Sequence, residues 1–132
     1  MIVLDASAAV GALAGEGVSR RIRARIDGER LHAPYLIEVE VLETLRRSAL
    51  TKVISHDRAA DARSDLVDLQ ITLYPHRPFA ARVWELRDNL SAYDAVYVAL
   101  AEALDAPLVT CDGRLARAPG VRARIEVFAL GE

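Results

Sequence analysis

Four acidic residues stand where a carboxylate could take part in catalysis: Asp5, Glu40, Asp94 and Asp112. Asp5 and Asp112 each follow a short apolar run, as expected at the carboxyl end of a buried strand. Asp94 opens a strongly apolar segment, and Glu40 lies between two valines, where an unpaired buried charge would be costly. Carboxylates gathered in one place repel one another unless a cation neutralises them. If the four meet, they predict a site for Mg²⁺ or Mn²⁺, which favour oxygen ligands.

Such an acidic metal site suits the hydrolysis of phosphodiesters. Divalent ions polarise the phosphate, lower the pKa of a bound water and stabilise the leaving oxygen. Zinc is disfavoured, because His32, His56 and His76 lack the spacing of a ligand set and Cys111 is the only cysteine. The lone cysteine also excludes an internal disulfide. The number of ions, and the carboxylate that orients the attacking water, stay open.

Each of these acids also has a simpler structural interpretation. Asp5 is a suitable helix N-cap, and Asp112 precedes a glycine in a typical turn pair. Asp94 in a first helical turn would complement the helix dipole. Glu40 could share a solvated helix face with neighbouring glutamates. A metal site therefore depends on the four carboxylates meeting in space.

The elements that would position these acids alternate between strands and helices. Apolar runs predict strands over residues 1–4, 71–74, 108–110 and 125–130. Helical spacing and capping residues predict helices over residues 6–14, 19–26, 35–50, 55–69, 78–89 and 92–104. We expect Pro34 to open the helix over 35–50. This alternation predicts an α/β fold whose mainly parallel sheet is covered by helices on both faces. Sites in such sheets lie at the carboxyl ends of the strands.

Composition narrows the class of protein. The 132 residues suit one domain, 1–132, and 52% hydrophobic with 27% charged residues is a globular balance. A net charge of −2 excludes a protein that coats nucleic acid by bulk charge. No signal peptide or apolar stretch of membrane-spanning length is visible, so we expect a cytoplasmic location and no membrane partner.

Three segments resemble the PIN-domain ribonucleases, and in particular the VapC-type toxins of bacterial toxin–antitoxin pairs. They read VLDASAAVGALAGE, APYLIEVEVLETLRR and LSAYDAVYVALAEALDAPLVTCDGRLAR, in the family's order. The resemblance implies a PIN-like three-layer α/β/α sandwich. It makes Asp5, Glu40, Asp94 and Asp112 the family's four metal-binding acids. Ser7 and Thr110 match positions where the family often carries a supporting hydroxyl, and Ser91 replaces a frequent threonine.

The same resemblance implies an activity and partners. The protein would be a Mg²⁺- or Mn²⁺-dependent endoribonuclease that arrests translation by cutting structured RNA such as transfer or ribosomal RNA. It would form a homodimer and bind a cognate VapB-type antitoxin. Arginines on the rim could hold RNA phosphates, although solubility also explains them. These candidates are Arg20, Arg21, Arg23, Arg25, Arg46, Arg47 and Arg114.

Three other classes of protein share parts of this pattern. A phosphoacceptor receiver domain needs an acidic pair after the first strand and a late lysine, but no lysine follows Lys52. A haloacid-dehalogenase-like phosphatase needs Asp-x-Asp where this chain has Asp-Ala-Ser. A catalytically silent PIN-fold module that binds RNA or a partner shares every feature except turnover, and it is the remaining alternative.

Overall fold

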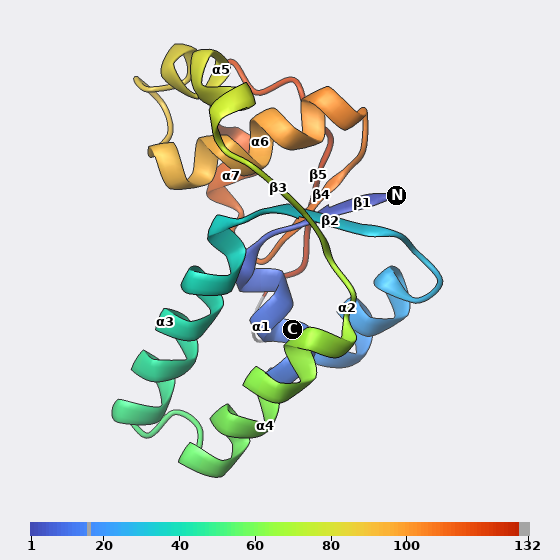
Figure 1. Ribbon diagram of the computed structural model, residues 1–132, viewed down its shortest axis with the longest axis vertical. Helices are drawn as coiled ribbons and strands as arrows, with labels where there is room; N and C mark the ends of the chain where they lie inside the picture. The colour runs from blue at the N-terminus through green and yellow to red at the C-terminus, as the bar shows by residue number, and fades with distance from the viewer. Residues whose placement is uncertain (16, 130–132) are drawn as a thin grey trace.

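A parallel five-stranded sheet between two helical layers forms the centre of the protein (Figure 1). The computed structural model describes residues 1–15 and 17–129. The strands are β1 (Ile2–Leu4), β2 (Leu31–Pro34), β3 (Thr72–Tyr74), β4 (Leu108–Thr110) and β5 (Ile125–Val127). Their order across the sheet is β3-β2-β1-β4-β5, and every neighbouring pair is parallel. The chain thus builds outward from β1 in one direction through β2 and β3, and then in the other through β4 and β5.

Helices cover both faces of this sheet, as the alternation of elements predicts. One layer holds α1 (Ala6–Ala14), α2 (Val18–Ile26), α3 (Leu36–Leu50) and α4 (His56–Asp68). The opposite layer holds α5 (Ala80–Glu85) and α6 (Ala92–Leu104), preceded by the 3₁₀ turn η1 (Arg77–Phe79). The short helix α7 (Arg114–Arg117) packs beside β5. Figure 1 shows the two layers on opposite sides of the strands, with α3 and α4 projecting as a hairpin.

Local capping fixes where several helices begin. Asp5, Ser55 and Ser91 each accept a hydrogen bond from a backbone N–H in the first turn of α1, α4 and α6 respectively. Helix α3 has no such cap of its own among the described residues. Instead, His76 Nε2 accepts a hydrogen bond of 3.0 Å from the backbone N–H of Leu36. A backbone N–H in the first turn of α3 therefore finds its hydrogen-bond acceptor in a residue that lies forty positions later in the chain.

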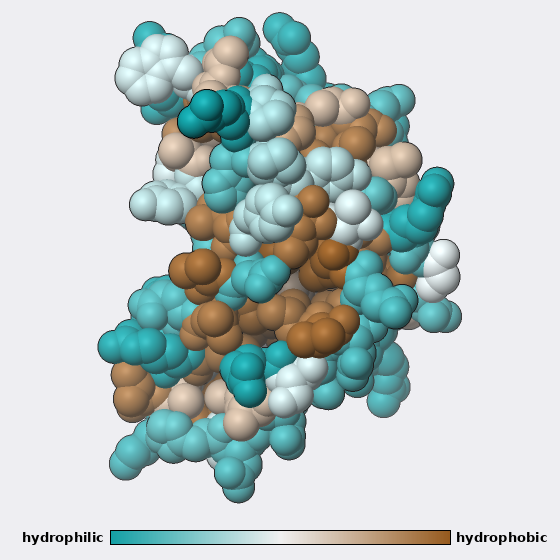
Figure 2. Space-filling model, in the orientation of Figure 1, coloured by the Kyte–Doolittle hydropathy of each residue, from teal (hydrophilic) through white to brown (hydrophobic). Residues whose placement is uncertain are grey.

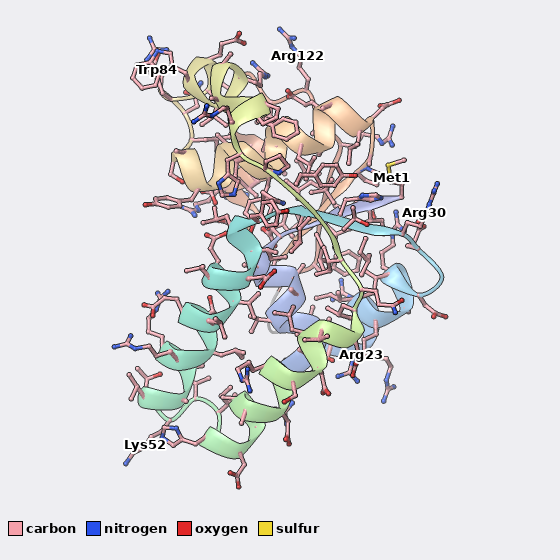
Figure 3. All side chains as sticks on the ribbon, in the orientation of Figure 1. Met1, Arg23, Arg30, Lys52, Trp84 and Arg122 are labelled. Carbon is pink, nitrogen blue, oxygen red and sulfur yellow. The ribbon has the colours of Figure 1, made fainter. Side chains whose placement is uncertain are left out.

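The core lies on both sides of the sheet. The three residues of β1 are fully buried, and residues 95–101 of α6 are all buried. Figure 2 shows apolar side chains gathered across the middle of the face that it presents, with hydrophilic side chains toward both ends. Lys52 lies at the tip of the α3–α4 hairpin and Trp84 at the opposite end of the molecule (Figure 3). Among the described helices, none combines the length and apolar character that crossing a bilayer requires.

The sequence analysis missed two elements and misplaced one residue. Strand β2 was not predicted, and Pro34 ends that strand instead of opening α3. Only Leu31 and Ala33 carry the apolar alternation of β2, which is too short a signal to distinguish from a loop. Helix α7 was also missed. The helix expected over 78–89 is the shorter η1–α5 pair, and β5 ends at Val127, while residue 130 lies outside the described residues.

Candidate active site

The four acids singled out in the sequence line one hollow. Strands β1 and β4 are neighbours, and they mark the point where the order of the sheet reverses, which leaves a crevice at their carboxyl ends. Asp5 follows β1 and Asp112 follows β4. Helices α3 and α6 bring Glu40 and Asp94 over the same edge. The resulting hollow has a volume of about 480 Å³, and Asp5, Glu40, Asp94 and Asp112 all contribute to its wall.

Asp5 is the most deeply held of these carboxylates, with only 7% of the residue exposed. Its Oδ1 accepts hydrogen bonds from the Ser7 hydroxyl at 2.7 Å and from the Ala8 backbone N–H at 2.9 Å. Its Oδ2 accepts one from the Thr110 hydroxyl at 2.5 Å. Burial raises the pKa of Asp5, while these three donors oppose that rise. Ser7 and Thr110 thus support an acid, as the family resemblance implies.

Glu40 is held by a residue that the sequence analysis did not single out. The Tyr97 hydroxyl donates a hydrogen bond of 2.6 Å to Glu40 Oε1, joining α6 to α3. Burial raises the pKa of Glu40, Tyr97 lowers it, and the charges of Asp94 and Asp5 raise it further. Tyr97 sits three residues after Asp94 on the same helix. That spacing was the available signal, because residues three apart share a helix face.

Asp94 and Asp112 close the other side of the hollow. The Asp94 backbone N–H donates to the Ser91 hydroxyl at 3.2 Å, which fixes the first turn of α6. Burial and the charge of Asp112 raise the pKa of Asp94. Asp112 differs, because hydrogen bonds from the Arg114 guanidinium hold its pKa below the usual value. The pKa is therefore raised for three of the acids, chiefly by burial, and the fourth acid is paired with the Arg114 guanidinium.

The chemistry of this donor set fits a hard divalent cation. The residues that line the hollow supply carboxylate and hydroxyl oxygens and include no histidine, while the guanidiniums of Arg47 and Arg114 lie beside them. Among residues 1–15 and 17–129, however, no three acidic, histidine or cysteine side chains are gathered closely enough to enclose an ion as they stand. Asp5, Glu40 and Asp112 are each turned toward a protein donor instead. Mg²⁺ suits such a site, because it commonly retains several waters and takes only one or two carboxylates directly.

The arginines predicted on the rim lie at four different places in the structure. Arg47 lines the acidic hollow, and Arg114 binds Asp112 beside it. Arg20, Arg21 and Arg23 line a separate hollow on α2, and Arg46 pairs with Glu43 on α3. Arg25 is engaged in structural ion pairs with Glu126 and Glu29. The structure therefore brings two of the seven, Arg47 and Arg114, next to the four acids.

Comparison with known proteins identifies relatives over nearly the whole chain. The PIN domain family model matches residues 2–121. The chain is 42% identical to Ribonuclease VapC12 of Mycobacterium tuberculosis over 133 aligned residues, which cover 98% of this chain and 100% of that protein. It is 50% identical over 120 residues to VapC ribonuclease Mb0985 of Mycobacterium bovis, covering 87% of this chain and 88% of the relative.

A solved structure shares the fold at much lower sequence identity. The structure of VapBC2 from Rickettsia felis, bound to a DNA fragment from their promoter, contains a chain that superposes with a TM-score of 0.68. The match covers 97% of this chain and 99% of that chain at 14% identity. The arrangement of sheet and helices described above is therefore found in both.

Proposed function

The chain belongs to the PIN-domain family, among the VapC ribonucleases, and on that premise we propose that it is the endoribonuclease toxin of a toxin–antitoxin pair. Its activity would depend on Mg²⁺ or Mn²⁺ held by Asp5, Glu40, Asp94 and Asp112. The observation that carries this proposal is the meeting of these four acids in one hollow, although they come from four different elements. The identities of 42% and 50% to named ribonucleases support the same reaction.

All four acids would contribute to binding a divalent ion. Asp5, Glu40 and Asp94 would supply its ligands directly or through water, and Asp112 would complete the site or hold a second ion. When bound, such an ion polarises the scissile phosphate and lowers the pKa of a coordinated water. Burial is the main cause of the raised pKa values of Glu40 and Asp94, and the neighbouring negative charges that add to it also make a cation favourable at this place.

The chain's other residues would orient this machinery. Ser7 and Thr110 fix the plane of the Asp5 carboxylate through opposite oxygens, and they are linked to each other at 3.3 Å. Tyr97 fixes Glu40 in the same way from α6. Arg47, on the wall of the hollow, is placed to meet an RNA phosphate. Hydroxyl donors that hold metal ligands commonly matter to activity almost as much as the ligands themselves.

We also propose the protein's natural partners, with the structural likeness to VapBC2 in support of one of them. A VapB-type antitoxin would bind the protein, in keeping with its structural likeness to a chain of the VapBC2 complex. The substrate would be structured RNA such as transfer or ribosomal RNA, and the active form a homodimer. Because the acidic hollow is open at the surface, an antitoxin could block it with a basic side chain.

Cleavage by the purified protein tests the proposal. We expect protein freed of antitoxin to cut structured RNA in Mg²⁺ or Mn²⁺, and EDTA to stop the reaction. Asp94→Asn should lower the rate by more than about 100-fold, because even groups that only support a metal ligand account for 10- to 100-fold. The matched control is Asp57→Asn, which makes the same change in the first turn of α4.

The outcomes separate the proposal from its alternative. Intact rates for Asp94→Asn would overturn the assignment of the site. RNA binding without cleavage, in metal-loaded protein and across transfer and ribosomal RNA substrates, would instead identify the silent binding module. If the protein does cut RNA, mapping of RNA ends after brief induction in cells would name the target.

A further inference from the structure

The Arg114 guanidinium contacts both carboxylate oxygens of Asp112. Its Nε lies 3.0 Å from Oδ1 and 3.1 Å from Oδ2, and its Nη2 lies 2.5 Å from Oδ2. The Arg114 backbone N–H adds a further hydrogen bond of 3.0 Å to Oδ1. One arginine thus satisfies both oxygens of an acid that lines the proposed metal site. The guanidinium thus places a positive charge directly beside this acid.

This ion pair does not hold the fold together. Asp112 and Arg114 are two residues apart, so their contact joins no distant elements, and the Arg114 side chain is 75% exposed. Arg82 offers a contrast within the same molecule. It makes a comparable two-pronged contact with Glu102, but its side chain is only 21% exposed and it links α5 to α6. Exposed ion pairs stabilise a fold weakly, so Arg114 can leave Asp112 at little cost.

A second hollow lies beside the acids and is available to the Arg114 side chain. Its volume is about 440 Å³, and its wall includes Asn89, Ser91, Asp94, Arg114, Leu115 and Arg117. Arg117 lies three residues after Arg114 on α7, and its charge also helps to lower the pKa of Asp112. Its guanidinium forms no hydrogen bond or salt bridge with another described side chain. Two guanidiniums and the Ser91 hydroxyl therefore border one space that adjoins Asp94. Guanidinium groups favour phosphate, because their planar forks match its oxygens.

We propose that Arg114 is a tethered cation that neutralises Asp112 until a divalent ion arrives. The released guanidinium then joins Arg117 in the second hollow and binds an RNA phosphate next to the one that is cut. Metal binding would thereby prepare the protein for its substrate. This inference rests on the proposed function, because it requires both a divalent ion and an RNA.

The first experiment measures metal affinity without any RNA. Mn²⁺ is titrated calorimetrically into the wild-type protein and into the variants Arg114→Ala, Arg117→Ala and Arg87→Ala. We expect Arg114→Ala to bind Mn²⁺ about two- to fivefold more tightly, which corresponds to removal of an exposed competing ion pair. Arg117→Ala removes the same charge from the same short helix and should change the affinity much less. Arg87, which lies over the Trp84 ring, is the distant control and should have no effect.

The second experiment measures RNA affinity in the two metal states. A short fluorescent RNA in which a methylene group replaces the leaving oxygen of each phosphate linkage, so that water cannot cleave it, is bound in EDTA and again in saturating Mn²⁺. Arg117→Ala should weaken binding in both conditions, because the Arg117 guanidinium has no salt bridge to another described residue that metal binding would have to release. Arg114→Ala should weaken it only in Mn²⁺, since Asp112 holds Arg114 in EDTA.

The results distinguish failure of this inference from failure of the proposed function. If Arg114→Ala binds Mn²⁺ no more tightly than wild type, or loses RNA affinity equally in both conditions, Arg114 is not a displaceable cation. The proposed function would still stand in that case. If the wild-type protein binds no Mn²⁺, or binds it equally well with Asp94→Asn, the metal site and this inference both fail.

Discussion

Individual residues at this site serve structure and chemistry together. Asp5 caps α1 through Oδ1 and also lines the acidic hollow, so the simple and the functional interpretations of this residue are compatible. Its buried carboxylate tolerates the lost hydration because three donors surround it. Among the described residues, Tyr97 is the one side chain that donates a hydrogen bond to Glu40, so Glu40 depends on that contact more heavily.

Removal of the Tyr97 hydroxyl tests this dependence. We expect Tyr97→Phe to weaken Mn²⁺ binding by about 10-fold, because the loss of a group that orients a ligand usually costs 10- to 100-fold. The free energy of unfolding should fall by only about 1 kcal/mol, the usual value of one hydrogen bond. Titration calorimetry and urea unfolding measure the two effects.

Tyr74→Phe provides a matched control for that substitution. Tyr74 also uses its hydroxyl in one buried contact, with His32 Nδ1 at 2.7 Å, but it lies on β3 away from the acids. The control should lose a similar amount of stability and keep its metal affinity. Equal effects of both variants on Mn²⁺ binding would show that Tyr97 has no special role.

Among the elements, α6 contributes most to the site. Its first turn carries Asp94, its second carries Tyr97, and its buried middle fixes it against the sheet. The helix begins where it does because the Ser91 hydroxyl accepts a hydrogen bond from the backbone of Asp94. Fraying of this first turn would move Asp94 before it affected the core.

The N-cap of α6 can be tested against an equivalent cap elsewhere. Ser91→Ala should lower the free energy of unfolding by about 1 kcal/mol, and Ser91→Thr should change it little. Ser55→Ala removes the same kind of hydrogen bond from the start of α4, at a distance from the acids. We expect a similar loss of stability for both alanine variants in urea unfolding, but a slower RNA cleavage only for Ser91→Ala. Equally slow cleavage by both would contradict the local role of this cap.

At the scale of the whole molecule, the site makes stability dependent on metal and pH. Burial raises the pKa of Asp5, Glu40 and Asp94, so the folded state binds more protons than the unfolded state above their ordinary pKa values. The stability that these acids contribute is fully present below the unfolded pKa and is lost as pH rises through the folded value. Asp112 acts in the opposite direction, because its pKa is lowered. A divalent ion relieves the repulsion of the ionised acids.

Because protonation and metal binding compete for the same carboxylates, the stabilising effect of Mn²⁺ should depend on pH. We expect Mn²⁺ to raise the midpoint of thermal unfolding more at about pH 8 than at about pH 5, because protons compete with the ion for the carboxylates. At one hundred times the dissociation constant the stabilisation would reach about 2.7 kcal/mol. In EDTA, Asp94→Asn should stabilise the protein more at the higher pH. A larger effect of Mn²⁺ at the lower pH would contradict the raised pKa values.

The amino-acid sequence by itself determined the elements whose residues signal them locally. Helix α1 and helix α6 begin and end where capping and apolar spacing predict, as does strand β4. The four acids could be named because Asp5 and Asp112 each follow an apolar strand-like run, while Glu40 and Asp94 lie in strongly apolar helical segments. The family resemblance rests on the same local segments, and the family match confirms it.

Only the tertiary structure decided how distant residues meet. Strand β2 has a weak pattern, and its place between β1 and β3 comes from pairing with both neighbours. The Tyr97–Glu40 contact spans 57 residues and the Arg25–Glu126 contact 101, so no local pattern contains them. Arg25 and Arg114 belong to one residue type, yet packing makes the first a structural link and leaves the second exposed beside the acids. Side-chain partners depend on the arrangement of the whole sheet, because that arrangement alone sets which surfaces face each other.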